Sequence, residues 1–450
     1  MDLRRKILID RLIGLPMVFF LNGICRILGK TLNRDHSVDR RSVRVIAVAK
    51  YFGMGSIVQA TPFLRSLRER FPDASIVFVT SLQNRALMER LEHIDTAIYV
   101  DDAGLRRLVS STVAAIVALI RQRVDLYFDL EVYSAYSTLV TLLCIARNRF
   151  GFYRYSTRFK EGIYTHLVYF NARLPIRRVY IQLGLTAGAE DLADDSIGPI
   201  QVEESDRAGL LRTWLSAGAG PETPYTVINP NASDLLLERR WPASSFVELV
   251  EGLAANGHRV VFTGAPSEAN YVSTLLDALS PAARAAATNM AGMLTLGELF
   301  ALLEGASCVV TNDTGPMHFS VALRRPVVCL FGPCSPDHYG FQIAKVEILY
   351  RQVFCSPCVH EIAEPPCAGN NVCMQFIEPP AVLAAAERLL AACTSPDSAA
   401  SPERLEVARS RVATSDSSGR PLGLVIRSSL SAGDEARGAN RGDTGATRRL

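Results

Sequence analysis

A regular alternation of buried strands and amphipathic helices constrains the fold of this chain more than any other feature. The first series of predicted strands occupies 43–49, 75–80, 97–100 and 124–130. Helical patterns such as 56–70 separate these strands. Alternation of this kind is typical of a parallel sheet, because a helix crosses over between consecutive strands. We therefore predict an N-terminal Rossmann-like domain over 41–188.

A second alternation follows in the C-terminal half. Its predicted strands are 225–230, 258–264, 307–313 and 326–332, with helices at 244–256, 267–279, 295–304 and 316–323. We predict a second Rossmann-like domain over 223–393, joined to the first by a linker over 189–222 that is rich in Gly, Ala, Ser and acids. The expected fold is α/β, with two doubly wound parallel-sheet domains facing a cleft. Ligands of such sheets bind beyond the carboxyl ends of the strands.

The two ends of the chain differ in composition from these domains. Residues 1–44 carry ten Lys/Arg against four Asp, a net charge of +6, around an apolar run at 13–29. That run is short and interrupted by Pro16 and Arg26, so 1–40 is predicted as a membrane-associating segment on an anionic surface. A helix packed on the body and a true span remain open. Residues 394–450 lack Phe, Tyr, Trp, Lys and Cys and are predicted to be disordered.

Overall charge and cysteine usage exclude some classes of function. A net charge of +3 and a pI of about 8.3, without basic runs interleaved with aromatics, argue against nucleic acid as a partner. The absence of a cleavage site after the apolar run favours the cytoplasm, where cysteines are thiols or metal ligands. Four cysteines lie within 19 residues, at Cys355, Cys358, Cys367 and Cys373. Their spacing permits zinc or disulfides but is not that of a standard zinc finger, so we expect unligated or structural thiols and no metal.

The strongest functional signal lies in residues 309–333, "VVTNDTGPMHFSVALRRPVVCLFGP". A strand ends near Asp313, and Thr314 and Gly315 then turn into a helix. The N–H groups at such a helix start favour phosphate oxygens, and His318 lies one turn further on. Asp313 as a simple helix cap is the alternative reading, but the whole unit of strand, turn, helix and second strand favours a phosphate site.

Two further segments supply candidate ligands for a nucleotide. Arg239 precedes a Trp-Pro helix start and can meet a pyrophosphate by bidentate contact. Glu268 falls in the first turn of a predicted helix and can accept a ribose or sugar hydroxyl. A solvated surface arginine and a carboxylate that stabilises the helix N-terminus are the structural alternatives.

These segments, together with the glycine loop at 51–62, resemble glycosyltransferase family 9, the heptosyltransferase family, over roughly residues 43–392. The resemblance implies a GT-B fold with an acceptor lobe and a nucleotide-sugar lobe, inverting metal-independent transfer, and no cofactor. The implied donor is a nucleotide diphosphate sugar, ADP-heptose by default. The implied acceptor is a lipopolysaccharide-type or lipid-linked glycan at the cytoplasmic face of the inner membrane.

Carried onto this sequence, the resemblance assigns the donor residues. The family's Asp-Thr-Gly-x-x-His motif falls on Asp313, Thr314, Gly315 and His318. The lysine that contacts the donor phosphates falls on Arg239, and the glutamate that contacts the ribose falls on Glu268.

The glycine loop departs from the family at the residue expected to be the general base. The loop contains Gly53, Gly55 and Thr61, but Ser56 stands where the family has aspartate. A serine hydroxyl is no base near neutral pH. The strand that ends in "YFDLEVYSAYS" offers Glu131, the preferred substitute base, and Asp129.

Other readings of the loop remain open at this point. The donor phosphate or another substrate group can take the proton, or the protein can bind a nucleotide sugar without transferring it. A sugar-nucleotide epimerase of the same architecture is a further rival.

Overall fold

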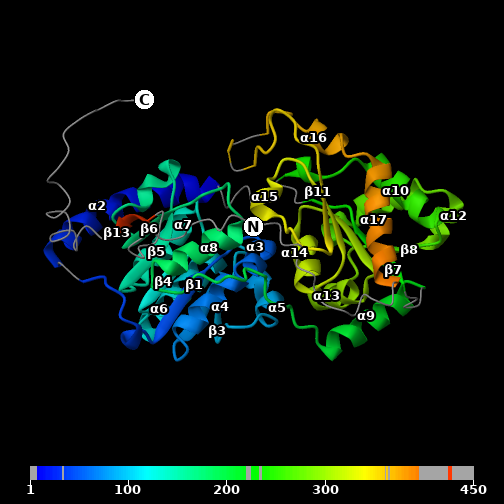
Figure 1. Ribbon diagram of the computed structural model, residues 1–450. Coiled ribbons are helices and arrows are strands. Elements are labelled where there is room, and N and C mark those ends of the chain that lie inside the picture. Colours follow the sequence, from blue (N-terminus) through cyan, green and yellow to red (C-terminus); the bar gives the residue numbers. More distant parts are fainter. Residues whose placement is uncertain are drawn as a thin grey trace.

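The computed structural model describes residues 8–32, 35–218, 224–232, 236–359, 361–362, 365–394 and 424–427. It forms two α/β lobes that lie side by side, the N-terminal lobe from blue to green and the C-terminal lobe from green to orange (Figure 1). The prediction of two doubly wound, Rossmann-like parallel-sheet domains is confirmed.

The sheet of the N-terminal lobe has the strand order β13-β6-β5-β4-β1-β2-β3. Its parallel strands are β1 (Val45–Ala49), β2 (Ser75–Ser81), β3 (Thr96–Val100), β4 (Leu126–Asp129), β5 (Asn148–Tyr153) and β6 (His166–Tyr169). β13 (Leu424–Arg427) pairs antiparallel with β6 and lies inside the region predicted to be disordered. The remainder of that predicted tail, 395–423 and 428–450, lies outside the described residues.

Helices cover this sheet on both faces, as a doubly wound sheet requires (Figure 1). They are α2 (Leu15–Leu32), preceded by the π-helical turn η1 (Asp10–Gly14), α3 (Met54–Gln59), α4 (Thr61–Arg70), α5 (Arg85–Met88), α6 (Leu105–Gln122), α7 (Ala135–Leu143) and α8 (Ile176–Leu185). The helix predicted over 56–70 is divided at Ala60, where α3 ends and Pro62 enters the first turn of α4. Proline fits a first turn because the N–H it lacks has no helical partner there.

The C-terminal lobe has a six-stranded parallel sheet in the order β12-β11-β10-β7-β8-β9. Its strands are β7 (Tyr225–Asn229), β8 (Arg259–Phe262), β9 (Ala287–Asn289), β10 (Cys308–Asn312), β11 (Val327–Phe331) and β12 (Val346–Tyr350). Its helices are α10 (Ala243–Ala255), α11 (Ala269–Asp277), α12 (Pro281–Ala286), α13 (Leu296–Gly305), α14 (Gly315–Ala322), α15 (Pro336–Tyr339), α16 (Val372–Gln375) and α17 (Pro379–Thr394).

The two lobes contact one another through the helix within the linker and through one helix of each lobe. α9 (Glu204–Ser216) lies within the predicted linker and packs on α13. Arg90 of the N-terminal lobe binds Asp206 of α9 through Nε and Nη2, on one edge of its guanidinium, with Nη2 2.8 Å from Oδ1. Closer to the carboxyl ends of the strands, α3 packs on α14. This contact brings the glycine loop of the N-terminal lobe against α14 of the C-terminal lobe, the helix that begins within the predicted phosphate motif.

The N-terminal helix α2 packs on the first lobe along one face. Gly14, Val18 and Asn22 are buried at a spacing of four residues, and the Asn22 amide donates to the carbonyl of Phe159 at 2.9 Å. Within the described residues, no helix is both long and apolar enough to cross a membrane.

Candidate active site

The end of β10 is the structural centre of the donor side. Asn312 is fully buried, and its amide donates to the carbonyls of Pro230 and Asn231 while its oxygen accepts from the backbone N–H of Trp241 at 3.2 Å. One side chain therefore joins the strand end, the loop after β7 and the segment that carries the arginines. No role was predicted for Asn312 from the sequence.

The predicted phosphate motif forms the start of α14. Thr314 is the residue before the helix, and its hydroxyl lies 3.2 Å from that of Thr311. Gly315 begins the helix and its N–H lacks a helical acceptor, whereas Pro316 has no N–H and the Met317 N–H donates to the Thr314 carbonyl at 3.2 Å. The buried Asp313 lies beside Arg239, whose Nη1 donates to the Asp313 carbonyl at 3.3 Å. Asp313, Thr314, Gly315 and Arg239 are thus brought together, as predicted.

The donor candidate Glu268 and Arg240, the residue after Arg239, belong to the same lobe. Arg240 does not join Arg239 but stacks on Tyr271, with its guanidinium carbon 3.9 Å from the ring centroid. Glu268 is half-buried, and its Oε2 accepts from the backbone N–H of Ala265 at 2.7 Å. That bond is the helix-start contact of the alternative reading.

His318 occupies the contact between the lobes. Its ring is buried, and that burial, with Arg177 and Arg239 nearby, outweighs the effect of Asp313 and lowers its pKa to about 4. His318 is therefore neutral near pH 7. Its Nδ1 lies 3.3 Å from the Gln59 amide nitrogen, which can only donate. The ring proton is consequently on Nε2, and the histidine can donate one hydrogen bond to a ligand.

Gly55 is required by the closeness of this contact. A Cβ at Gly55 would lie 2.2 Å from Cδ2 of His318. Gly53 lies just before α3 and has a φ of +81°, a backbone conformation that residues with a side chain rarely adopt. The two glycines therefore serve different needs, close approach at one and backbone conformation at the other.

Arg177 of α8 completes the contact and was not foreseen from the sequence. Its Nη1 donates to Gln59 Oε1 at 3.3 Å and to the carbonyl of Gly340 at 3.1 Å. Its guanidinium also lies over the ring of Phe341. The only advance signal was a pair of arginines, Arg177 and Arg178, in an otherwise apolar helical pattern.

Glu131 lies at the carboxyl end of β4, directly below the glycine loop. Its Oε2 binds Nζ of Lys50 at 2.8 Å, and its Oε1 accepts from the N–H groups of Tyr51 and Phe52 at 2.8 and 3.1 Å. The side chain is 11% exposed. These three donors meet both carboxylate oxygens, and one lone pair of Oε2 has no partner among the described residues. Lys50 follows β1 directly and was overlooked.

Asp129 differs from Glu131 in being completely buried. Its Oδ1 accepts from the Ser137 hydroxyl and the Glu131 N–H, and its Oδ2 binds Tyr164 and the buried Lys160. A carboxylate without exposed surface cannot touch a substrate. We assign Asp129 to the support of the segment that carries Glu131.

The other loop residues have local partners. Ser56 is half-buried and hydrogen-bonds with Tyr180 of α8, a phenol whose pKa is raised chiefly by burial. Thr61 is buried, donates to the Val58 carbonyl and accepts from the Gly198 N–H, both at 2.7 Å. Thr61 thus fastens the linker to α4, while Ser56 stays at the loop surface.

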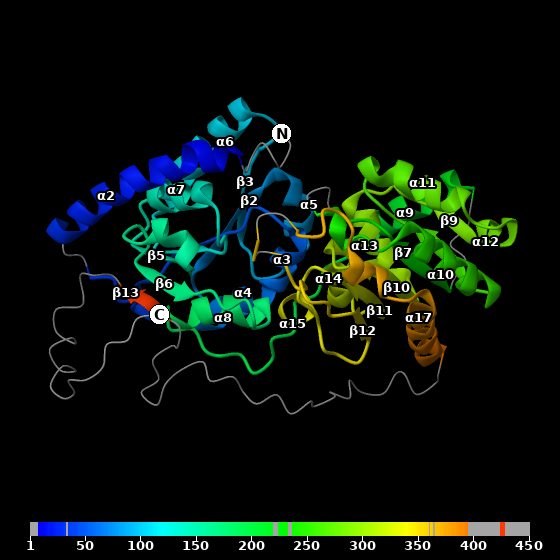
Figure 2. The same cartoon turned by 90° about the horizontal axis from the view of Figure 1, so that it is seen from above.

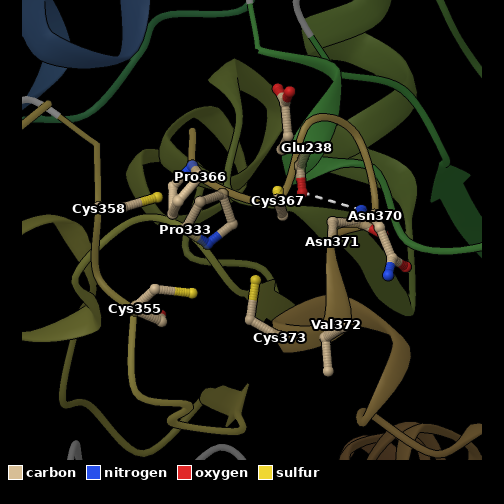
Figure 3. A pocket seen from close by; sticks show the side chains of 11 residues that line it. Glu238, Pro333, Cys355, Cys358, Pro366, Cys367, Asn370, Asn371, Val372 and Cys373 are labelled. Carbon is tan, nitrogen blue, oxygen red and sulfur yellow. Dashed lines mark hydrogen bonds between the residues drawn. The ribbon is translucent and has the colours of Figure 1, made fainter. Parts of the chain in front are cut away.

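The four late cysteines line one cavity of about 60 Å³ (Figure 3). All are free thiols, and burial raises the pKa of Cys373 to about 11. No group of three His, Cys, Asp or Glu side chains in the described ranges is arranged to hold a metal ion. Asn371, beside the cavity, donates to the carbonyls of Glu238 and Arg240 at 2.9 and 2.7 Å. The cysteine segment therefore supports the loop that carries Arg239.

Comparison with known proteins agrees with this arrangement. The model of glycosyltransferase family 9 (heptosyltransferase) matches residues 117–367. Lipopolysaccharide heptosyltransferase 2 of Escherichia coli K12 is 28% identical over 298 residues, covering 63% of this chain and 81% of that protein. Two solved structures share the fold. The E. coli ADP-heptose lps heptosyltransferase II has a TM-score of 0.63 at 23% identity, covering 78% of this chain and 99% of its own.

The second structure is a family 9 glycosyl transferase from Veillonella parvula, with a TM-score of 0.65 at 22% identity over 80% of this chain and 99% of its own. The family match extends over more than half of the 450 residues. The chain belongs to glycosyltransferase family 9, and it is a glycosyltransferase.

Proposed function

We propose that this protein transfers heptose from ADP-heptose to a lipopolysaccharide-type, lipid-linked acceptor, with inversion and without a metal ion. The observation that carries the proposal is the convergence of Arg239, the start of α14 and His318 at the end of β10. These groups offer a cation, a backbone N–H and a neutral side-chain donor to a diphosphate. The curated relatives that supply the heptose and acceptor assignments are lipopolysaccharide heptosyltransferases.

On the donor side, Arg239 neutralises the diphosphate as it leaves, and the Gly315 N–H at the start of α14 donates to one of its oxygens. The charge that develops on the leaving group is thereby met by groups of the chain itself. The Nε2–H of His318 donates to a donor oxygen, and Glu268 is the proposed acceptor for a ribose hydroxyl.

On the acceptor side, we propose that Glu131 is the general base. Its carboxylate lies under the glycine loop, and the lone pair of Oε2 that Lys50 does not use can accept the proton of the acceptor hydroxyl. The hydroxyl oxygen then attacks the anomeric carbon from the face opposite the diphosphate. Gly53, Gly55, Ser56 and Thr61 shape the loop that holds the acceptor.

We also propose that the protein works at the cytoplasmic face of the inner membrane, where 1–40 associates with anionic lipid. The exposed apolar residues of α2 support this location.

The decisive experiment is a transfer assay with purified protein, several nucleotide sugars and a lipopolysaccharide acceptor that lacks the outer sugars. We expect consumption of ADP-heptose only when the acceptor is present, and an acceptor mass increased by one heptose. Transfer from a different nucleotide sugar would refute the heptose assignment. Conversion of the donor without an acceptor would favour epimerase-type chemistry.

A further inference from the structure

Helix α6 exposes an apolar stripe that the fold does not use. Leu105, Val109 and Val113 recur every fourth residue and are 54%, 56% and 56% exposed. Val117 and Ile120 continue the stripe, each 38% exposed. Single exposed apolar residues need no explanation, but a continuous stripe along one 18-residue helix marks an interaction surface.

The other face of α6 already accounts for its packing on the lobe. Ala115 and Leu119 are buried on that face, and the hydroxyl of Thr112 lies 2.7 Å from that of Tyr136 on α7. Folding therefore leaves the stripe without a partner among the described residues.

The charges on α6 suit a negatively charged partner. Arg106 and Arg107 lie in its first turn, Arg121 and Arg123 lie at its end, and the helix sequence "LRRLVSSTVAAIVALIRQ" contains no acid. Apolar side chains between terminal arginines are typical of a helix that lies in the plane of an anionic bilayer.

α2 adds a second apolar face on the same side of the lobe. It exposes Phe19, Phe20 and Ile27, at 64%, 72% and 68%, while its opposite face packs on the lobe. α7 contacts both helices, and Figure 2 shows α2, α7 and α6 together on one side of the N-terminal lobe. Asp10 of η1 accepts from the N–H groups of Ala135 and Tyr136 at the start of α7. The two exposed faces are thus held to one another through α7.

We propose that α6 and α2 together form one surface that binds an anionic lipid bilayer, so that membrane contact does not depend on the N-terminal segment alone. A second copy of the chain fits this surface less well, because pairing α6 with itself would bring arginines against arginines. The inference extends the membrane location proposed above and would place the acceptor lobe, rather than the donor lobe, against the lipid.

The test uses the full chain and vesicle co-sedimentation, so that it is independent of transfer activity. The vesicles are phosphatidylcholine alone, and phosphatidylcholine mixed with phosphatidylglycerol. The variants are Val109→Glu with Val113→Glu on α6, and Arg106→Ser with Arg121→Ser. The matched controls are Leu215→Glu and Arg212→Ser, on the exposed face of α9.

We expect the wild-type protein to bind the anionic vesicles and to bind them less at high salt. The valine pair should weaken partitioning at least about tenfold, because two apolar side chains are replaced by charges that cannot enter the bilayer. The arginine pair should weaken it severalfold, and the α9 controls should bind as wild type.

The proposal is overturned if the valine pair, folded by circular dichroism, binds as wild type, or if wild type ignores anionic vesicles. It is equally overturned if light scattering shows that the valine-pair variant and the wild-type protein differ in oligomeric state, because that identifies the partner as a second copy. Transfer to a water-soluble, delipidated acceptor should survive the valine pair. If the wild-type protein also fails to transfer to this acceptor, the result counts against the proposed function and not against this surface.

Discussion

The donor side and the acceptor side of the site are built differently. At the end of β10, Asn312 fixes the surrounding loops and Arg239 bonds to a backbone carbonyl, so the groups offered to a diphosphate are set by the fold. Under the glycine loop, the position of Glu131 depends on one lysine and two N–H groups. The phosphate site is therefore tied to the sheet, whereas the candidate base is tied to a loop.

This difference explains why one side keeps its motif while the other has changed. Substituting Asp313 or Gly315 would disturb a strand end and a helix start together. Ser56 lies at the loop surface, where its only described partner is the Tyr180 phenol. A change of residue there alters chemistry with little effect on folding.

The largest effect is expected from Glu131→Gln, which keeps the shape and an oxygen for the N–H groups but removes the base. Turnover should fall by roughly 10²–10⁴-fold with donor affinity nearly unchanged. Steady-state kinetics at varied donor concentration measures turnover and the donor KM, and Glu89→Gln on the exposed surface of the same lobe is the control. A variant with near-normal turnover would reduce Glu131 to a residue that positions the loop.

Gly55→Ala tests whether the two sides must touch. The added methyl would displace His318, since its carbon would lie 2.2 Å from Cδ2, so we expect turnover to fall by about 10²-fold. Gly104→Ala, where nothing lies within 4 Å of the new methyl, is the control for a glycine substitution in the same lobe. If transfer rates stay equal in the two variants, the contact between the lobes is not part of the active arrangement.

Arg239→Met isolates the donor side. A lost charge-assisted contact with a diphosphate should raise the dissociation constant for ADP by roughly 10–100-fold. Titration calorimetry measures this directly, with Arg284→Met on α12 as the control. Unchanged ADP affinity would remove Arg239 from the phosphate site.

The smallest effect concerns the charge of His318. Because its pKa in the folded protein is about 4, below its ordinary value of 6.5, the unfolded chain binds a proton between these pH values that the folded chain does not. This histidine therefore stabilises the fold above pH 6.5, and that contribution is lost as pH falls toward 4. His318→Gln should reduce the drop in melting temperature across this window by a few degrees. An equal drop in both proteins would mean that His318 is charged in the folded state.

The sequence predicted the two lobes and the donor motif because both depend on local patterns. Alternating strands and helices specify the sheets, and Asp313 to His318 lie within one turn and one helix. Arg177, Gln59 and Lys50 were missed because their partners come from distant parts of the chain. Lys50 could have been found, since it follows β1 and the carboxyl ends of neighbouring parallel strands meet at one edge. For Arg177, the contact with Gly340 depends on how the lobes sit together.

We propose that Glu131 replaces the acid missing at position 56, and restoring that acid is the sharpest test of this role. Turnover would be compared among Ser56→Ala, Glu131→Gln, and Glu131→Gln combined with Ser56→Asp, using the same donor and acceptor. If Glu131 is the base, we expect nearly normal turnover for Ser56→Ala, a loss of roughly 10²–10⁴-fold for Glu131→Gln, and partial recovery in the double variant. Loss of activity in Ser56→Ala together with normal turnover in Glu131→Gln would show that Glu131 is not the base.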